Sequence, residues 1–414
     1  MPRDQTCGAG VADAAVAGRH SINLSPDMLA NIHGRLSILD RLAFASVFRQ
    51  SRDAFKPEAP WLVLPGETLE TVTLFSPADR RATAVRAMDP SLRGHAVLGS
   101  SGGWLVTADA RARMHVVNPV TGEQRALPAI TTIPCLEERF GRSLFVFKLK
   151  PFVPGPPYDG VCKPHAMFCL VPEKMRSHLY RKVVLSAFPG GAAMLITHER
   201  FGVPAFATAE DAAWRLAPSR EGVEDAVHHD GRFYSVTYSG AVEVWEHDAD
   251  AGHFTSAAVT PRMIGNASGN TAWRRKYLVV VPGGRLMVVL KGWKRATHGC
   301  KRWSCSFKVL VLDGGQWKGT DDIGDAALFV GANESLYVST RVHPELKPGH
   351  VYYTEDDLIQ ASPCDVYKGS SHYEHEDHRG VGVFCLKNGT VEDLEGLGQC
   401  PSWPPPAWFM PSIP

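Results

Sequence analysis

The stretch from Gly222 to Asp250 constrains the fold of this chain more than any other part of the sequence. It contains three runs rich in apolar, aromatic and β-branched residues, which are Val223–His229, Arg232–Tyr238 and Ala241–Glu246. Asp230-Gly231 and Ser239-Gly240 separate the runs. Alternation with a period of two, interrupted by Asp-Gly and Ser-Gly, indicates consecutive antiparallel hairpins. A single small sheet of this kind cannot bury both of its faces, so it needs neighbouring sheets like itself.

Short strand-forming segments recur through the whole chain after Pro57, and turn residues separate them. The central segments that begin at Phe233, Leu286 and Leu336 follow one another at intervals of about 50 residues, the repeat length of kelch-like propeller blades. A propeller hides the faces of each sheet against neighbouring blades. The sequence therefore predicts a mainly β fold, a kelch-like β-propeller over residues 57–414. It does not specify the number of blades, and Pro151–Arg181 is interpreted as an insertion.

Helical signals come before the strands. Ser25 can serve as an N-cap, Pro26 suits the first helical position, and Asp27 favours the positive end of a helix. A second helix is expected to start at Ser37 or Asp40, and a third to cover Phe48–Phe55. We therefore expect a small three-helix module over residues 21–56, after a disordered segment over residues 1–20.

The helical segment resembles an F-box, whose pattern is a Leu-Pro start, an acidic residue, Leu or Ile at helical spacing, and a Val-Cys-x-x-Trp-Arg end. The resemblance implies adaptor binding by Leu24, Pro26, Leu29, Ile32, Leu36, Leu42 and Val47. The end departs from the pattern, with Phe48 in place of the Cys and Ser51 in place of the Trp. Losing that Trp removes an aromatic anchor of the kind that often dominates interface energy. The alternative is a helical cap that packs on the large domain.

Four further segments resemble plant F-box proteins with a C-terminal KIB-type β-propeller. They are RGHAVLGSSGGWLVTAD, NPVTGEQRALP, AFATAEDAAWRLAPS and DIGDAALFVGANESLYVST. The resemblance implies the substrate-recognition subunit of a Skp–cullin–F-box E3 ubiquitin ligase. Its helices would hold the Skp-type adaptor and its propeller would hold a target protein. It implies no catalytic residue and no cofactor, because other subunits transfer ubiquitin.

Cations and aromatic residues occur together over Gly292–Ser304, which is expected to be a loop between two strands. The residues that we predict to contact a target there are Trp293, Lys294, Arg295, Arg302 and Trp303. Trp and Arg are enriched among the residues that dominate binding energy at interfaces. The alternative is that both tryptophans pack on their own blade. Two rival functions stay open: a propeller interaction protein with a degenerate F-box and no ligase coupling, and an RNA-binding propeller that uses these residues.

The composition excludes some classes of protein. Lys and Arg total 44 against 43 Asp and Glu, a formal charge of +1, which argues against a general nucleic-acid or membrane-surface binder. No apolar run approaches the roughly 20 residues of a membrane span. Nine cysteines, with no secretory signal, favour reduced thiols in the cytosol or nucleus.

No metal site is expected. Zinc ligands usually come in pairs two to four residues apart, and neither Cys162 with Cys169 nor Cys300 with Cys305 has that spacing. The run His372–His378 is interpreted as an exposed loop. No Ser/His/Asp set, phosphate-binding glycine loop or carboxylate pair occurs in a suitable context.

Overall fold

The computed structural model describes most of the chain after residue 23. The described residues are 24–36, 38–48, 58–66, 71–86, 95–109, 111–134, 136–139, 144–147, 169–170, 175, 178–186, 190–197, 202–219, 221–248, 252–263, 271–295, 303–358, 380–398 and 403–412. The chain forms two compact units, Met1–Lys56 and Pro57–Pro414.

The first unit contains the helices α1 (Pro26–Arg35) and α2 (Ile38–Val47). The Ser25 hydroxyl accepts a hydrogen bond from the Met28 N–H at 3.4 Å, so the predicted N-cap is present. Arg41 of α2 donates through Nε to the carbonyls of His33 and Leu36, each at 3.0 Å, and so satisfies carbonyls at the end of α1. The third helix, expected over Phe48–Phe55, and the segment 1–20 lie outside the described residues, apart from Phe48 itself.

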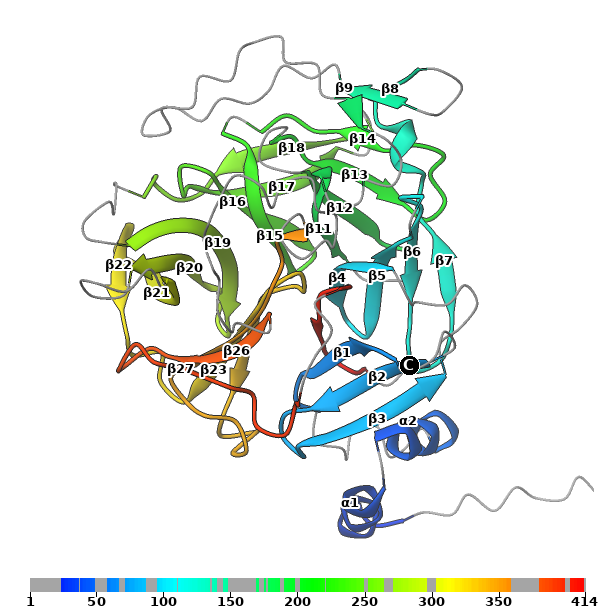
Figure 1. Cartoon of the computed structure of the whole chain (residues 1–414), viewed down its shortest axis with the longest axis vertical. Helices are drawn as coiled ribbons and strands as arrows, with labels where there is room; N and C mark the ends of the chain where they lie inside the picture. Colours follow the sequence, from blue (N-terminus) through cyan, green and yellow to red (C-terminus); the bar gives the residue numbers. More distant parts are fainter. Residues whose placement is uncertain are drawn as a thin grey trace, which may run out of the picture. The chain divides into compact units, whose positions relative to one another are not determined.

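The second unit is a six-bladed β-propeller, which confirms the predicted fold class and supplies the blade number (Figure 1). Strands are given from the axis outward. Blade 1 contains β28 (Ala407–Phe409), β1 (Trp61–Pro65), β2 (Thr71–Ser76) and β3 (Arg81–Arg86). Blade 2 contains β4 (Ala96–Ser101), β5 (Trp104–Ala108), β6 (Met114–Val117) and β7 (Gln124–Ala126). Blade 3 contains β11 (Tyr180–Leu185), β12 (Ala192–Thr197), β13 (Ala205–Thr208) and β14 (Arg215–Leu216).

The remaining blades follow in chain order. Blade 4 contains β15 (Val223–His229), β16 (Arg232–Thr237), β17 (Val242–Asp248) and β18 (His253–Ala258). Blade 5 contains β19 (Thr271–Val281), β20 (Arg285–Arg295), β21 (Trp303–Asp313) and β22 (Gln316–Thr320). Blade 6 contains β24 (Leu336–Ser339), β23 (Ala326–Val330), β25 (His350–Thr354), β26 (Val381–Cys385) and β27 (Val391–Glu392). Between blades 2 and 3 the chain forms the short 3₁₀ helix η2 (Ile130–Thr132) and a three-stranded sheet of β8 (Leu136–Arg139), β9 (Leu144–Phe147) and β10 (Cys169–Leu170).

The predicted hairpins of the Gly222–Asp250 stretch are confirmed in blade 4. Strands β15, β16 and β17 start within one residue of the predicted positions. Asp230 and Gly231 have positive φ values of 46° and 77°, as a tight hairpin turn requires. The fourth strand, β18, was not predicted, because its sequence HFTSAA has one large apolar residue, Phe254, and no apolar–polar alternation.

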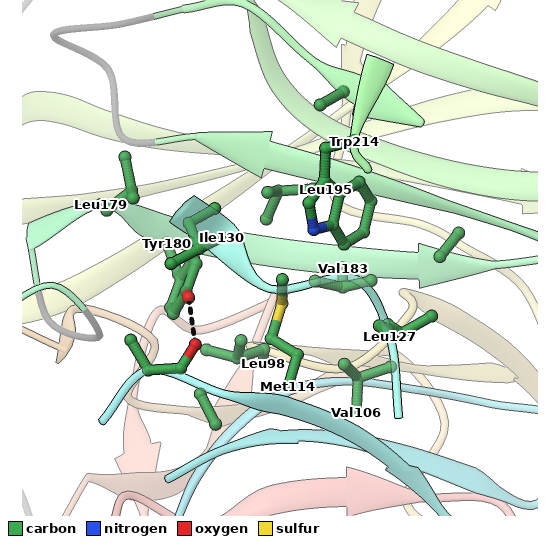
Figure 2. Close-up of a cluster of buried hydrophobic side chains, with 14 of the residues drawn as sticks. Leu98, Val106, Met114, Leu127, Ile130, Leu179, Tyr180, Val183, Leu195 and Trp214 are labelled. Atoms are coloured by element: carbon green, nitrogen blue, oxygen red, sulfur yellow. Dashed lines mark hydrogen bonds between the residues drawn. The ribbon is translucent and has the colours of Figure 1, made fainter. Parts of the chain in front are cut away.

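The blades pack face to face, as the propeller prediction requires. Along β23, Leu328 and Val330 pack toward blade 5, whereas Ala327 and Phe329 pack toward blade 1. Figure 2 shows the contact between blades 2 and 3, where Tyr180 donates its hydroxyl to the Ala112 carbonyl at 2.7 Å. A buried hydroxyl that is bonded in this way adds specificity to an apolar contact.

Blade 6 departs from the regular order. Its strand β24 follows β23 in sequence but lies nearer the axis, where it contacts β19, and β23 therefore pairs in parallel with β25. The interval from Leu286 to Leu336 thus matches a blade in length only. Leu286 lies in the second strand of blade 5, whereas Leu336 begins the innermost strand of blade 6. The spacing of segments in the sequence indicates the length of a repeat. The order of strands within a sheet depends on hydrogen bonding between strands that are distant in the sequence.

Candidate functional site

The second unit has a cleft of about 780 Å³ between blades 3 and 4. Its volume lies in the range of sites that bind ligands or single anchoring side chains. Strands β12, β13 and β14 form one wall, and β16, β17 and β18 form the other. Its lining includes Ala192, Phe206, Thr208, Asp211, Arg215, His228, Arg232, Phe233, Trp245, Glu246, His247, Gly252, His253 and Phe254.

Aromatic rings form the floor of the cleft. Phe206 of blade 3 stacks on Phe254 of blade 4, with ring centroids 3.9 Å apart and planes inclined by 11°. Phe233 and Trp245 meet Phe206 at 5.6 and 5.4 Å. Trp245 donates its indole N–H to Ser235 at 2.8 Å, so its polar atom is satisfied. Phe206, Phe233 and Trp245 are themselves buried, each at most 3% exposed, whereas Phe254 is half-buried. The Phe254 ring is therefore the part of this rigid aromatic floor that an aromatic or aliphatic side chain can contact.

Paired charges form the rim. Arg215 donates to Asp211 at 2.7 Å and to the Gly252 carbonyl of blade 4 at 3.0 Å. Arg232 lies 3.4 Å from Glu246. Each rim cation thus has a carboxylate partner within the cleft, so the cleft has little net charge from these residues. It suits an uncharged segment better than a strongly acidic or basic one.

His228 connects the cleft to the propeller axis. Burial lowers the pKa of the His228 imidazole below its usual range, and the neighbouring His229 adds to this effect. Its main-chain N–H donates to Glu334 at 2.8 Å, and Ser101 of blade 2 donates to the same carboxylate at 2.5 Å. The turn between β23 and β24 therefore ties blades 2, 4 and 6 together, and burial raises the pKa of Glu334.

A fully buried ion pair lies beside this turn. Lys182 of blade 3 and Asp225 of blade 4 are both 0% exposed, with Nζ and Oδ1 2.6 Å apart. Asp225 also accepts the Leu278 N–H of blade 5 at 2.8 Å and the Ser335 hydroxyl of blade 6 at 3.3 Å. Burial raises the pKa of the Asp225 carboxyl, and Lys182 acts in the opposite direction. One carboxylate thus links four blades.

A second buried cluster joins blades 4, 5 and 6. Arg275 donates through Nε to Asp356 at 2.8 Å, and Tyr277 donates its hydroxyl to the same carboxylate at 3.0 Å. Lys276 lies 2.6 Å from Glu224. These cations have carboxylate partners inside the protein, so the cluster is a structural cross-link between blades.

The residues predicted to contact a target were expected in a loop, but those that the structure describes lie at the ends of two strands. Trp293, Lys294 and Arg295 are the last residues of β20, and Trp303 is the first residue of β21. The ladder continues to the pair Arg295↔Trp303, so the two strands extend farther than the turn residues in the sequence suggested. Arg302 lies outside the described residues. Their role in target binding stays a prediction.

The residues predicted to bind an adaptor fall into buried and exposed positions. Leu29 is only 4% exposed, which makes it a core residue of the helical unit. Leu24, Ile32 and Leu36 are half-buried, Pro26 is exposed, and Leu42 belongs to α2. Val47 is 85% exposed, and Met28, which was not predicted, is 55% exposed. Val47 and Met28 are therefore the apolar side chains most available to a partner among these residues.

The described part of the chain was also compared with the requirements of a metal site and of a reactive thiol. In the described ranges, no three His, Cys, Asp or Glu side chains are grouped so as to hold a metal ion. Burial raises the pKa of the Cys305 thiol to about 11, which keeps it protonated. Cys300 and the run His372–His378 lie outside the described residues. No helix in the described part of the chain is long and apolar enough to span a bilayer.

The fold and its internal cross-links define a six-bladed β-propeller. The sequence profile of the KIB1-4 β-propeller family matches residues 74–385, and the chain belongs to that family. F-box protein KIB4 of Arabidopsis thaliana is 22% identical over 358 residues, which cover 82% of this chain and 80% of the relative. F-box protein KIB3 of the same plant is 28% identical over 127 residues, 28% of each chain. The resemblance to plant F-box proteins with a KIB-type propeller is confirmed.

Among solved structures, YCF48 from Cyanidioschyzon merolae shares 11% identity, with a TM-score of 0.27, over 65% of this chain and 71% of the other. At so low a TM-score the likeness adds nothing to the fold assignment, which rests on the six blades themselves.

Proposed function

We propose that the chain is the substrate-recognition subunit of a Skp–cullin–F-box E3 ubiquitin ligase. The observation that carries the proposal is the combination of a KIB1-4 propeller with a separate N-terminal helical unit in a chain whose relatives are named F-box proteins. In this role the helical unit binds a Skp-type adaptor and the propeller holds a target protein. The chain acts as a non-catalytic adaptor, because ubiquitin transfer belongs to other subunits. It works in the cytoplasm or nucleus.

The exposed apolar side chains of the helical unit support the adaptor part of the proposal. Val47 ends α2 and Met28 lies in the first turn of α1. Large apolar side chains in water gain free energy when a partner covers them. Leu29 and His33, by contrast, are buried in the structure. Burial, with a contribution from Arg41, lowers the pKa of His33 to about 4, so this histidine is neutral at pH 7.

Val47→Asp is expected to reduce the affinity for a purified Skp-type adaptor by about a hundredfold or more, because it places an unpaired carboxylate in the contact. The fold of the unit should survive, since Val47 is exposed. Isothermal titration calorimetry with the full chain measures the affinity. Val47→Ile keeps the apolar surface and is the matched control, which should bind like the unchanged protein.

Two results would contradict this proposal in different ways. If the unchanged chain does not bind the adaptor at micromolar concentration, the rival with a degenerate F-box and no ligase coupling, suggested by Phe48 and Ser51, is correct. If the chain binds the adaptor and Val47→Asp binds equally well, Val47 lies outside the contact. An RNA-binding propeller would instead show affinity for single-stranded RNA that falls steeply with added salt.

A further inference from the structure

In the part of the chain that the structure describes, the outer strand of blade 4 has a main-chain edge with no paired strand. β18 pairs with β17 on one side only. The Val259 N–H donates to the Val242 carbonyl of β17 at 2.8 Å, and main-chain groups alternate in direction along a strand. The N–H and C=O groups of Phe254, Ser256 and Ala258 therefore point away from β17. Within the described part of the chain, these groups have no main-chain partner.

This edge lacks the protection that the other blades have. Natural proteins place charges or prolines on edge strands, which prevents pairing with other chains. The outer strands of the other five blades each carry at least one charged residue, namely Arg81 and Arg86 in β3, Arg125 in β7, Arg215 in β14, Lys318 in β22 and Glu392 in β27. β18 reads HFTSAA, without Lys, Arg, Asp, Glu or Pro, and most of its residues are exposed.

The cleft between blades 3 and 4 opens beside this edge. Its lining includes Gly252, His253 and Phe254, at the start of β18. His247 pairs with Phe254 across the β17–β18 ladder, and both line the cleft. A residue on an added strand directly opposite Phe254 would have its side chain on this same face of the sheet. That side chain would therefore enter the cleft and meet the half-buried ring of Phe254, which stacks on the buried Phe206 behind it.

We infer that β18 binds an extended segment of the target protein, which adds a fifth strand to blade 4 and places one large apolar or aromatic side chain in the cleft. The inference rests on the proposed function, in which the propeller holds the target. Main-chain hydrogen bonds supply affinity in such strand addition, and a pocket for an alternate side chain supplies specificity. The charge-neutral rim, with Arg215 paired to Asp211 and Arg232 near Glu246, fits a segment of low charge.

A second copy of this chain fits the edge less well. In an antiparallel pairing of two β18 strands, the start of one strand meets the end of the other. Only outward-facing residues can pair across this edge, so the cleft beside Phe254 would then face Ala258 of the second copy. A methyl side chain cannot fill a cleft of about 780 Å³. A partner with a larger side chain at that position is the better complement.

Ser256→Pro tests the edge directly. The N–H of Ser256 points away from β17, so proline removes an outward donor and leaves the β17–β18 ladder intact. Ser256→Ala keeps the N–H and is the matched control. The probe is a phage-displayed library of random peptides longer than the 6 residues of β18. Selection is done on the full chain, and a synthetic copy of the enriched peptide is then titrated against each variant.

The expected result is an enriched peptide without an internal proline and with an aromatic or large aliphatic residue at one fixed position. Its affinity should fall about tenfold or more in Ser256→Pro and stay unchanged in Ser256→Ala. Ala192→Trp, which fills the cleft from β12, should weaken the same peptide and leave the edge intact. Thermal melting followed by circular dichroism checks that each variant is folded. If Ser256→Pro does not fold, Ala258→Pro takes its place, because the N–H of Ala258 also points away from β17.

Equal binding to the two Ser256 variants, or a selection that enriches no peptide, overturns the inference. A dimer in sedimentation analysis that Ser256→Pro dissociates also overturns it, because a second copy would then occupy the edge. Adaptor binding separates this inference from the proposed function, since Ser256→Pro leaves the helical unit unchanged. If the chain binds the adaptor but Ser256→Pro does not weaken peptide binding, the inference about β18 is wrong and the proposed function stands.

Discussion

Removing residues 407–414 is expected to abolish cooperative folding of the propeller. These residues contain β28, which closes the ring by pairing with β1 at Trp61↔Phe409, Leu62↔Trp408 and Val63↔Ala407. Trp408 and Phe409 are both 0% exposed. Deleting one buried aromatic side chain costs about 3–5 kcal/mol, and a whole domain is stable by only about 5–15 kcal/mol. The truncated chain loses two such side chains together with an inner strand.

Thermal unfolding followed by circular dichroism measures this effect, with soluble yield as a second readout. The single change Trp408→Ala is a milder form of the same test and should cost about 3–5 kcal/mol. Ser412→Ala removes an exposed hydrogen bond to the Gly102 carbonyl in the same tail and is the control, with little expected change. A truncated chain that melts at the temperature of the full chain would show that β28 does not hold the ring closed.

Lys182→Met is expected to lower the free energy of unfolding by about 3–5 kcal/mol, because it leaves the buried Asp225 carboxylate without its cation. The cost should be this large because the position is completely enclosed and water cannot replace the ammonium group. Asp225 must still accept the Leu278 N–H and the Ser335 hydroxyl, so it cannot move toward solvent. Urea unfolding measures the change.

A double-mutant cycle separates the ion pair from the packing around it. Asp225→Asn removes the charge but keeps an acceptor for the Leu278 N–H. The double variant Lys182→Met/Asp225→Asn should be less destabilised than the sum of the single changes, since no unpaired charge is left in the core. Strict additivity of the two changes would show that Lys182 and Asp225 do not stabilise one another.

Local sequence patterns predicted the blades well where each strand pairs with its neighbour in the chain. The hairpin of β15 and β16 depends on alternation and on a turn at Asp230-Gly231, and both are visible within a few residues. The N-cap at Ser25 is similarly local. β18 was not predicted because Phe254 is the only large apolar residue in its sequence HFTSAA, which therefore shows no apolar–polar alternation. The small, uncharged residues that hid β18 from sequence reasoning also leave its edge without charges, which makes it a candidate binding strand.

The candidate site was less predictable. Clusters of cations and tryptophans drew attention to residues 293–303, because residue types at hot spots can be read from a sequence. The cleft could not be read in this way, since Phe206 and Phe254 stack across two blades and are 48 positions apart in the printed sequence. A phenylalanine in the sequence does not by itself indicate a binding cleft. It does so only when the fold places it beside a second aromatic ring from another blade.

The sequence by itself determined that this chain builds small antiparallel sheets that must pack against one another, because alternation and turn chemistry act between near neighbours. It also determined the start of α1, through a cap of a few residues. Only the tertiary structure decided the number of blades, the closure of blade 1 by β28, the order of strands in blade 6 and the pairing of Lys182 with Asp225. These features join distant parts of the chain, as the Ser100 hydroxyl and the Trp408 carbonyl do across 308 positions. No local pattern encodes such a contact, since its free energy includes the entropy cost of bringing together residues that are far apart in the chain.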